Sequence, residues 1–368
     1  MLVYYALAAV CVFFAELGFI FEKRNKTTSI LLYLVSVLLV CLFAGFRDLS
    51  VGTDTSSYAY DSYILSKQSS FSFFSHSPRF SKWPLFYRCI CWWSSNLFGF
   101  AGYLFCIELV IVLPVLIACR SFLKNWMALG FAVYMIIFYP MSFNLMRQMC
   151  GMGFILLAFI LIEKKKYVGS VCMIILGLGF HFTTLLGLLL YPLILFSKNK
   201  FLASSLKKIC TCIFGLAFIC ILPSVLNFVT ATTGTFESYT INAVGGDGLH
   251  CLLVTVLCFA IFSIFPYWEV QRNSFVSAKE LNTDMTIVAL FGLICFSLSL
   301  FSFWFYRIGI EFLYIIILLI PNICMQIKNR RERTLALTFS LLLLLFWSLD
   351  YYEIVHSNNV VPYIMSIG

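Results

Sequence analysis

The stretch SILLYLVSVLLVCLFAGF at residues 29–46 decides the fold, because it carries no charged residue over its whole length. An α-helix needs about 20 predominantly apolar residues to cross the hydrocarbon core of a bilayer. Similar runs recur along the 368 residues, of which 62% are hydrophobic and only 11% are charged. Soluble domains average about 45–50% apolar and about 25% charged residues. The composition therefore excludes an ordinary soluble protein.

These apolar runs predict an all-α, polytopic membrane protein with about twelve transmembrane helices. A β-barrel is excluded because its strands would alternate apolar and polar residues. The whole chain, residues 1–368, is expected to form a single integral membrane domain. The expected spans cover residues 2–20, 29–46, 99–119, 126–143, 148–162, 167–180, 182–197, 209–229, 249–268, 284–305, 308–325 and 334–349.

Lys and Arg divide unequally between the two sides of the predicted bundle. Eighteen of the 25 fall in one set of connections, which marks that side as cytoplasmic because short cytoplasmic loops are enriched in Lys and Arg. The termini, a large loop at 47–98 between the second and third spans, and a second loop at 230–248 then face outward. The net charge of +9 thus anchors the cytoplasmic face and does not indicate a nucleic-acid partner. Seven residues remain on the outward side: Arg47, Lys67, Arg79, Lys82, Arg88, Arg147 and Arg307.

The outward loop at 47–98 is expected to contain a surface or re-entrant helix over residues 84–96. Pro84 suits the first turn of such a helix, because proline lacks the N–H that has no partner there. Trp92 and Trp93 are typical of a membrane interface.

Three of the outward arginines, Arg47, Arg147 and Arg307, lie at the outer ends of predicted spans. A guanidinium group binds phosphate or carboxylate at two points, so a cationic pocket at this depth suits a phosphorylated lipid headgroup. Structural alternatives exist for each arginine. Arg307 precedes Glu311 by four residues and could form an ion pair within the helix. Arg147, which is followed by Gln148, could extend to the lipid headgroups.

The string RDLSVGTDTSSY at 47–58 combines a turn residue, Gly52, with the carboxylate Asp54 and with Tyr58. Helix capping alone would also explain its Gly-Thr-Asp segment. His181 falls at the outer turn between the sixth and seventh spans and is the residue type best suited to take a proton near neutral pH. A structural role is equally compatible with a lone interfacial histidine. Glu16 and Glu108, inside predicted spans, are expected to form hydrogen bonds between helices.

An ordered series of motifs resembles the EpsG/Wzy group of polysaccharide polymerases. The segments are FRDLSVGTDTSSY at 46–58, NLMRQ at 144–148, GFHFTT at 179–184 and YRIGIEF at 306–312. The resemblance extends over nearly the whole chain. It departs from the usual pattern at Lys82-Trp83-Pro84, where these proteins often carry an acidic residue before the proline.

The resemblance implies a glycosyltransferase of GT-C-like architecture in the bacterial cytoplasmic (inner) membrane, with its active site facing the periplasm. Such an enzyme joins undecaprenyl-pyrophosphate-linked oligosaccharide repeat units into an O-antigen, a capsule or an exopolysaccharide. The three arginines would stabilise the leaving pyrophosphate, and either His181, the favoured candidate, or Asp54 would activate the acceptor hydroxyl. The residues expected to line or support the substrate site are Tyr58, Arg79, Arg88, Gln148 and Glu311.

No cofactor and no metal ion are expected, and no spacing of the 15 cysteines matches a zinc site. The expected partners are the lipid-linked oligosaccharide as both donor and acceptor, membrane lipid, and a chain-length regulator protein. A ligase that moves a finished glycan to another lipid is the nearest alternative function. A lipid-linked glycan flippase or other transporter, and a membrane acyltransferase, are more distant ones.

Overall fold

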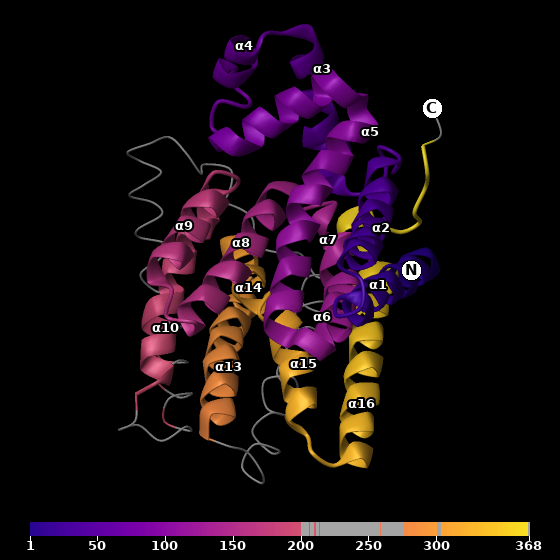
Figure 1. The fold of residues 1–368 in the computed structure, drawn as a ribbon. Helices are drawn as coiled ribbons and strands as arrows, with labels where there is room; N and C mark the ends of the chain where they lie inside the picture. The colour runs from indigo at the N-terminus through magenta and orange to yellow at the C-terminus, as the bar shows by residue number, and fades with distance from the viewer. Residues whose placement is uncertain are drawn as a thin grey trace. The chain divides into compact units, whose positions relative to one another are not determined.

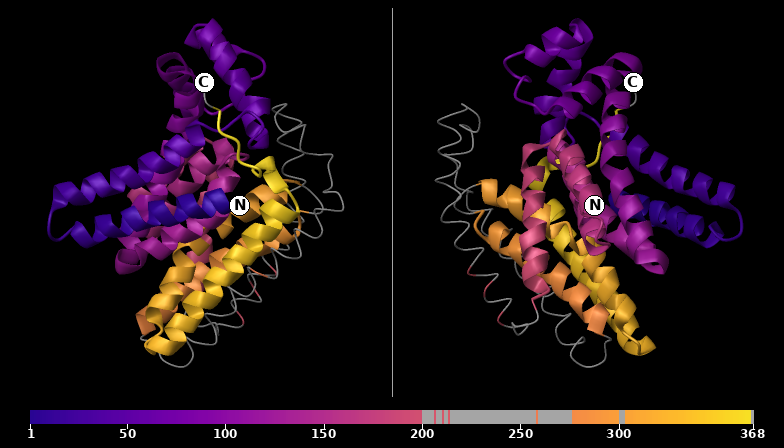
Figure 2. Two further views of the ribbon diagram at one scale, coloured as in Figure 1. Left: turned by 90° about the vertical axis from the view of Figure 1, so that its right-hand side faces the viewer. Right: turned by 60° about the vertical axis from the view of Figure 1, so that its left-hand side comes forward.

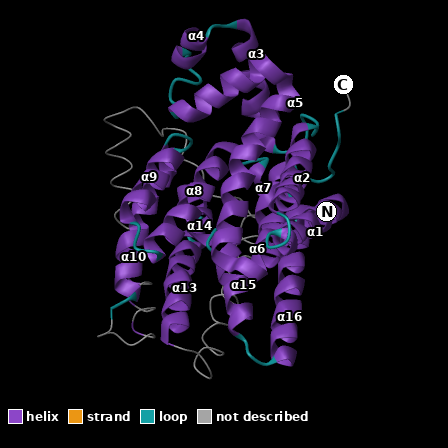
Figure 3. Ribbon diagram, viewed as in Figure 1, coloured by secondary structure: helices purple, strands orange, loops and turns teal. Residues whose placement is uncertain are grey.

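The computed structural model describes residues 1–199, 276–299 and 303–366, together with the single positions 206, 210, 213 and 258. Regular structure in these ranges is helical (Figure 3), apart from one isolated bridge between Arg47 and Met365. The all-α fold class is therefore confirmed. The chain forms two compact units, unit 1 (Met1–Gly187 and Ser348–Gly368) and unit 2 (Leu188–Trp347). That the two units make a single membrane domain stays a prediction.

Six helical stretches among the described residues are long and apolar enough to cross a membrane, as expected of a multi-pass protein. Apart from the single positions 210, 213 and 258, two predicted spans, 209–229 and 249–268, and the predicted loop 230–248 lie outside the described residues. The number of twelve spans stays a prediction. The six stretches are Leu2–Phe21, Lys26–Gly45, Leu85–Ser142, Met146–Glu163, Trp304–Gln326 and Arg330–Ile354, and shorter apolar helices cover Tyr167–Leu178, Phe182–Ser197 and Thr283–Ser297.

Unit 1 begins with an antiparallel pair of helices, α1 (Leu2–Phe21) and α2 (Lys26–Gly45), which lie side by side (Figure 2). The Asn25 side chain caps α2 by accepting the N–H of Thr28. The pair is held internally by the Ser29 hydroxyl, which donates to the Gly18 carbonyl at 2.7 Å. Small and hydroxyl-bearing residues of this kind let apolar helices approach closely.

The centre of unit 1 is built from α5 (Leu85–Ala118), α6 (Met127–Val133), the π-helical turn η4 (Tyr134–Phe138), α7 (Tyr139–Ser142) and α8 (Met146–Glu163). Helix α5 is broken at Gly99, whose φ of 72° is not helical. Glu108 of α5 is buried and accepts hydrogen bonds from the Tyr134 hydroxyl at 3.0 Å and the Ser142 hydroxyl at 2.9 Å. These are the hydrogen bonds between helices that the sequence predicts for Glu108.

Helix α9 (Tyr167–Leu178) and the 3-10 segment η5 (Phe182–Leu189) pack on α8 through glycines. A Cβ added at Gly151 would lie 2.2 Å from the Thr184 Oγ1, and one added at Gly177 would lie 2.4 Å from the Thr184 Cγ2. The Thr184 side chain therefore fills the space that these two glycines leave between the helices.

Residues 47–98 are more helical than a loop. They contain the π-helical turn η1 (Thr55–Ala59), α3 (Tyr60–Gln68), α4 (Phe71–His76) and the first half of α5. Figure 1 shows these elements gathered at one end of unit 1. The helix expected over 84–96 is present, with Pro84 as its N-cap residue. Its location at the membrane interface stays a prediction.

The C-terminal segment returns to unit 1 through η7 (Asp350–Ile354) and η8 (Ser357–Asn359). The Tyr352 hydroxyl donates to the Ile137 carbonyl at 2.5 Å. The N-terminal amino group forms an ion pair with Glu353 at 2.5 Å, and the Tyr4 hydroxyl donates to the Val360 carbonyl at 2.7 Å. The two ends of the chain are thereby fastened to each other.

Unit 2 contains α10 (Leu190–Ser197), α13 (Val276–Ser297), α14 (Phe303–Leu313), α15 (Ile316–Gln326) and α16 (Arg330–Leu349). Helices α13 and α14 approach so closely that a Cβ at Gly309 would lie 2.5 Å from the Phe296 nitrogen. Lys198, just after α10, forms an ion pair with the buried Asp284 of α13 at 3.5 Å.

Candidate functional site

Arg47 lies just beyond α2 and is almost completely buried, with 2% of its surface exposed. Its Nε donates to the Thr55 hydroxyl at 3.0 Å, and its Nη1 donates to the Ala44 carbonyl at 2.8 Å. The guanidinium also lies over the Phe143 ring, 4.3 Å from the centroid. Burial lowers the pKa of Arg47, and the negative charge of Glu108 opposes that shift. The donors of the Arg47 guanidinium are thus occupied by protein acceptors, and these contacts fix the loop that runs from α2 to Thr55.

Gly52 docks this loop against the end of α7. Its φ of +84° is a left-handed conformation that glycine adopts without strain. A Cβ at this position would lie 2.5 Å from the Phe143 carbonyl oxygen. Both observations require glycine here, so the turn predicted from the sequence is also a close backbone contact.

Arg147 lies in the first turn of α8 and is half-buried. Its guanidinium lies over two aromatic rings, 4.6 Å from the Trp83 centroid and 5.6 Å from the Tyr58 centroid. Among the residues that the structure describes, it forms neither an ion pair nor a hydrogen bond. A guanidinium group with uncommitted donors next to aromatic rings is suited to bind an anion.

The turn η1 links the two arginines. Thr55, at its start, accepts the hydrogen bond from Arg47, while Tyr58, three residues later, contacts Arg147. The Thr55 hydroxyl also donates to the Val51 carbonyl at 2.8 Å, which fixes the beginning of the turn. The structure thus brings together Arg47, Arg147 and Tyr58 from the predicted site.

Asp54 and Gln148 flank this arrangement. Asp54 immediately precedes η1 and lies about one helical turn before Tyr58, so it belongs to the same side of the helix. Gln148 follows Arg147 in α8 and is buried, with 1% of its surface exposed. Both predicted residues therefore belong to the segments that carry the contact between Tyr58 and Arg147.

His181 lies in the turn between α9 and η5 and is mostly buried. Its Nδ1 accepts the backbone N–H of Thr183 at 3.3 Å and lies 2.8 Å from the Thr183 hydroxyl. An accepting Nδ1 assigns the proton of the neutral ring to Nε2. The His181 carbonyl accepts the N–H of Thr184, which packs on Gly151, one turn beyond Arg147 in α8.

The same turn meets the start of α5. The Gly179 carbonyl accepts the N–H groups of Phe86 at 2.9 Å and Tyr87 at 3.2 Å, which satisfies two donors at the helix N-terminus. Trp83, which lies beside Arg147, also contacts Tyr87, with the two ring centroids 5.4 Å apart. The GFHFTT segment is therefore part of the same assembly as Arg147.

Arg79 and Arg88 make contacts among the helices of residues 47–98. Arg79 pairs with Asp61 at 2.6 Å and donates to the Ser57 carbonyl at 2.7 Å, both at the surface. Arg88 donates from Nη1 to the Ser75 carbonyl at 2.8 Å and to the Ser75 hydroxyl at 2.7 Å. These contacts tie α3 and α4 to their neighbours, and the contribution of either arginine to substrate binding stays a prediction.

Arg307 and Glu311 lie four residues apart on α14 of unit 2. Glu311 is buried with 2% of its surface exposed, and Arg307 is half-buried. The predicted convergence of Arg307 with Arg47 and Arg147 stays a prediction.

Sequence reasoning missed two parts of the site. Trp83 was expected only as a departure from a family pattern, yet its ring lies against Arg147. The C-terminal tail had no predicted role, yet the Asn144 amide donates to the Asn358 Oδ1 at 2.6 Å. The pair Asn358-Asn359, a sequence typical of tight turns, was the available signal for the tail.

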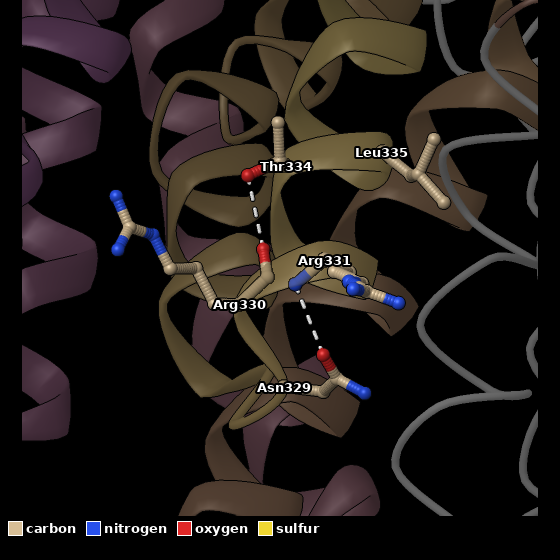
Figure 4. A pocket seen from close by; sticks show the side chains of 5 residues that line it. All are labelled: Asn329, Arg330, Arg331, Thr334 and Leu335. Atoms are coloured by element: carbon tan, nitrogen blue, oxygen red, sulfur yellow. Dashed lines mark hydrogen bonds between the residues drawn. The ribbon is translucent and has the colours of Figure 1, made fainter.

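A second basic surface, unlike the surroundings of Arg147, is a hollow of about 810 Å³ in unit 2. It is lined by Asn329, Arg330, Arg331, Thr334 and Leu335. Figure 4 shows that its Arg330 and Arg331 side chains point in different directions. Its helix N-terminus is capped internally, because the Asn329 Oδ1 accepts the Arg331 N–H at 2.9 Å. The two guanidinium groups thus do not converge on one ligand position.

Within the described part of the chain, no three His, Cys, Asp or Glu side chains are grouped so that they could hold a metal ion.

Comparisons with known proteins agree with the motif pattern. No curated protein and no solved structure matches the chain. The model of the EpsG family matches residues 30–365, which include every predicted site residue. This membrane protein therefore belongs to the EpsG family, whose members resemble Wzy-type polysaccharide polymerases.

Proposed function

We propose that this protein polymerises undecaprenyl-pyrophosphate-linked oligosaccharide repeat units on the outer face of the bacterial cytoplasmic membrane. The enzyme is a GT-C-like glycosyltransferase with about twelve spans, and its product is a surface polysaccharide. The observation that carries the proposal is Arg147, a half-buried cation that lies over the Tyr58 and Trp83 rings without an acidic partner among the described residues. Membership of the EpsG family supports the polymerase class.

The proposed reaction transfers the growing glycan to a hydroxyl group of the next repeat unit. The acceptor oxygen forms a bond to the anomeric carbon, and the bond from that carbon to the pyrophosphate oxygen breaks. The electron pair of the broken bond goes to the lipid pyrophosphate, and Arg147 binds this leaving group. A preorganised donor of this kind is worth about 3 kcal/mol or more in the transition state. Arg307 is a second proposed anion ligand.

Asp54 is the proposed general base that takes the proton of the acceptor hydroxyl, because a neutral His181 whose Nδ1 accepts from Thr183 carries its proton on Nε2. His181 then donates a hydrogen bond to the substrate. Arg47 acts as a positioning residue, since its donors are committed to Thr55 and Ala44. Tyr58, with 42% of its surface exposed, offers a ring on which a sugar can stack beside Arg147.

A gene-deletion strain complemented with single variants tests the proposal. Arg147→Ala should abolish chains longer than one repeat unit, while Arg120→Ala should leave the full ladder, with equal protein amounts in the membrane. Arg120 is a suitable control because it is an exposed cation that pairs with Glu22. A full ladder from Arg147→Ala, or from the deletion strain itself, would overturn the proposal.

The same strain separates the other functions by the glycan that accumulates. Loss of a polymerase leaves single repeat units on the final acceptor. Loss of a ligase leaves long chains on the lipid carrier, and loss of a flippase leaves single units on the inner leaflet. Asp54→Asn and His181→Gln test the base, because only removal of the base should abolish transfer while donor binding persists.

A further inference from the structure

The C-terminal tail, residues 355–366, is paired with the loop that carries Arg47. The Asp48 N–H donates to the Ile364 carbonyl at 2.9 Å, and the Ser366 N–H donates to the Phe46 carbonyl at 2.8 Å. The Tyr363 ring stacks on Phe43 with centroids 3.8 Å apart. Figure 1 shows this tail running beside the end of α2. One end of the tail is thus anchored where α2 stops.

The other end of the tail contacts two segments of the candidate site through consecutive residues. The Asn359 carbonyl accepts the Gly52 N–H at 2.8 Å, and the Asn358 Oδ1 accepts the Asn144 amide at 2.6 Å. His356, Asn358 and Asn359 have φ values of 51°, 71° and 50°. Asparagine tolerates this left-handed conformation better than most residues, so the tail can curl tightly between the two segments.

We propose that Asn358 is a positioning residue: its bond to Asn144, next to the bond of the Asn359 carbonyl with Gly52, keeps η1 beside the first turn of α8. Gly52 precedes Tyr58 by six residues, and Asn144 precedes Arg147 by three. The tail therefore forms hydrogen bonds with the segments that lead into Tyr58 and Arg147, and through these segments it sets the position of the cation that receives the lipid pyrophosphate. This inference rests on the proposed function, and it goes beyond it by assigning a role to the tail.

Exchange of the amides for carboxylates tests the Asn144–Asn358 pair directly. In Asn358→Asp a carboxylate oxygen still accepts from Asn144, and in Asn144→Asp the Asn358 amide can turn and donate. Each single variant should retain transfer within about threefold of the unaltered protein. In the double variant Asn144→Asp/Asn358→Asp two like charges face each other without a donor, so transfer should fall roughly tenfold or more.

The matched control is the double variant Asn144→Asp/Asn359→Asp. It adds the same charges to the same segments, but the Asn359 side chain is exposed and this residue contacts the loop through its backbone carbonyl. Transfer is measured in membrane vesicles with lipid-linked repeat units extracted from the deletion strain. The expected result is a raised KM for these units in Asn144→Asp/Asn358→Asp, with a melting temperature equal to that of the control.

Two results overturn the inference. One is equal transfer by the two double variants. The other is a loss of transfer that accompanies a lower melting temperature without a change in KM, because that pattern indicates a role in folding alone. A full ladder from Arg147→Ala contradicts the proposed function instead, so the two failures are distinguishable.

Discussion

Arg47 and Arg147 occupy equivalent places in the sequence, each at the outer end of a predicted span, yet their surroundings differ. Arg47 is 2% exposed, and its donors bind Thr55 and Ala44. Arg147 is half-buried beside two aromatic rings and has no polar partner among the described residues. A guanidinium group that is already bound to protein acceptors shapes the backbone, whereas one with uncommitted donors can bind an anion. The comparison therefore assigns different roles to two arginines that the sequence does not distinguish.

Gly52→Ala should have the largest effect on stability, because it disturbs the loop on which the Arg47 arrangement depends. The left-handed φ and the contact with Phe143 together predict a loss of roughly 2–5 kcal/mol in the free energy of unfolding. Gly99→Ala is the matched control, since Gly99 has a similar φ of 72° but no atom within 4 Å of the place that a Cβ would take. That control carries the backbone cost alone and should lose about 1–3 kcal/mol. Thermal unfolding of the detergent-solubilised variants measures both, and equal losses would contradict the close contact.

Lysine substitutions separate the two arginines directly. Arg47→Lys keeps the charge but loses the bond to Thr55, so the free energy of unfolding should fall by about 1–3 kcal/mol. Arg147→Lys should change stability by less than about 0.5 kcal/mol, yet lower transfer roughly tenfold because a point charge replaces the two-point fork. Melting temperature and transfer in membrane vesicles are measured for both. The distinction fails if Arg147→Lys unfolds the protein while Arg47→Lys does not.

Tyr58→Leu should weaken transfer more modestly. A cation–π contact contributes about 0.5–2 kcal/mol, so its loss predicts a reduction of roughly 2–30-fold in transfer. Tyr60→Leu provides the control, because Tyr60 is also exposed but its ring contacts Phe100 instead. Tyr58→Phe retains the ring and should remain near the activity of the unaltered protein. Equal losses from Tyr58→Leu and Tyr60→Leu would show that the contact with Arg147 does not matter for transfer.

Local features of the fold could be predicted from the sequence because they depend on neighbouring residues. The apolar runs of α1 and α2, the start of α5 after Pro84 and the turn at Gly52 are all of this kind. The contact between Tyr58 and Arg147 joins motifs nearly 90 residues apart, so the sequence predicts the participants without their pairing. Such pairing depends on packing over long sequence separations.

The environment of each side chain was beyond sequence reasoning for a different reason. Whether a guanidinium group is desolvated depends on what surrounds it in space, and Phe143 and Thr55 surround Arg47 from segments on either side of it. Trp83 lies in an aromatic stretch typical of a membrane interface, which concealed its contact with Arg147. The pair Asn358-Asn359 indicates a tight turn in the tail but not its partners, so the hydrogen bonds with Gly52 and Asn144 emerged only from the structure.

Arg79→Ala should have the smallest effect and tests how far the comparison extends. Its ion pair with Asp61 is exposed, and exposed pairs contribute about 0–1 kcal/mol and weaken as salt is added. The free energy of unfolding should change by less than about 1 kcal/mol, and the polysaccharide ladder on gels should be unchanged. Because the Arg79 donors already bind Asp61 and Ser57, they follow the pattern of Arg47 and not that of Arg147. The contrary result is that Arg79→Ala abolishes the ladder with an unchanged melting temperature. An arginine whose donors already bind protein acceptors would then contribute to transfer, and the partners of the donors would no longer distinguish positioning residues from substrate ligands.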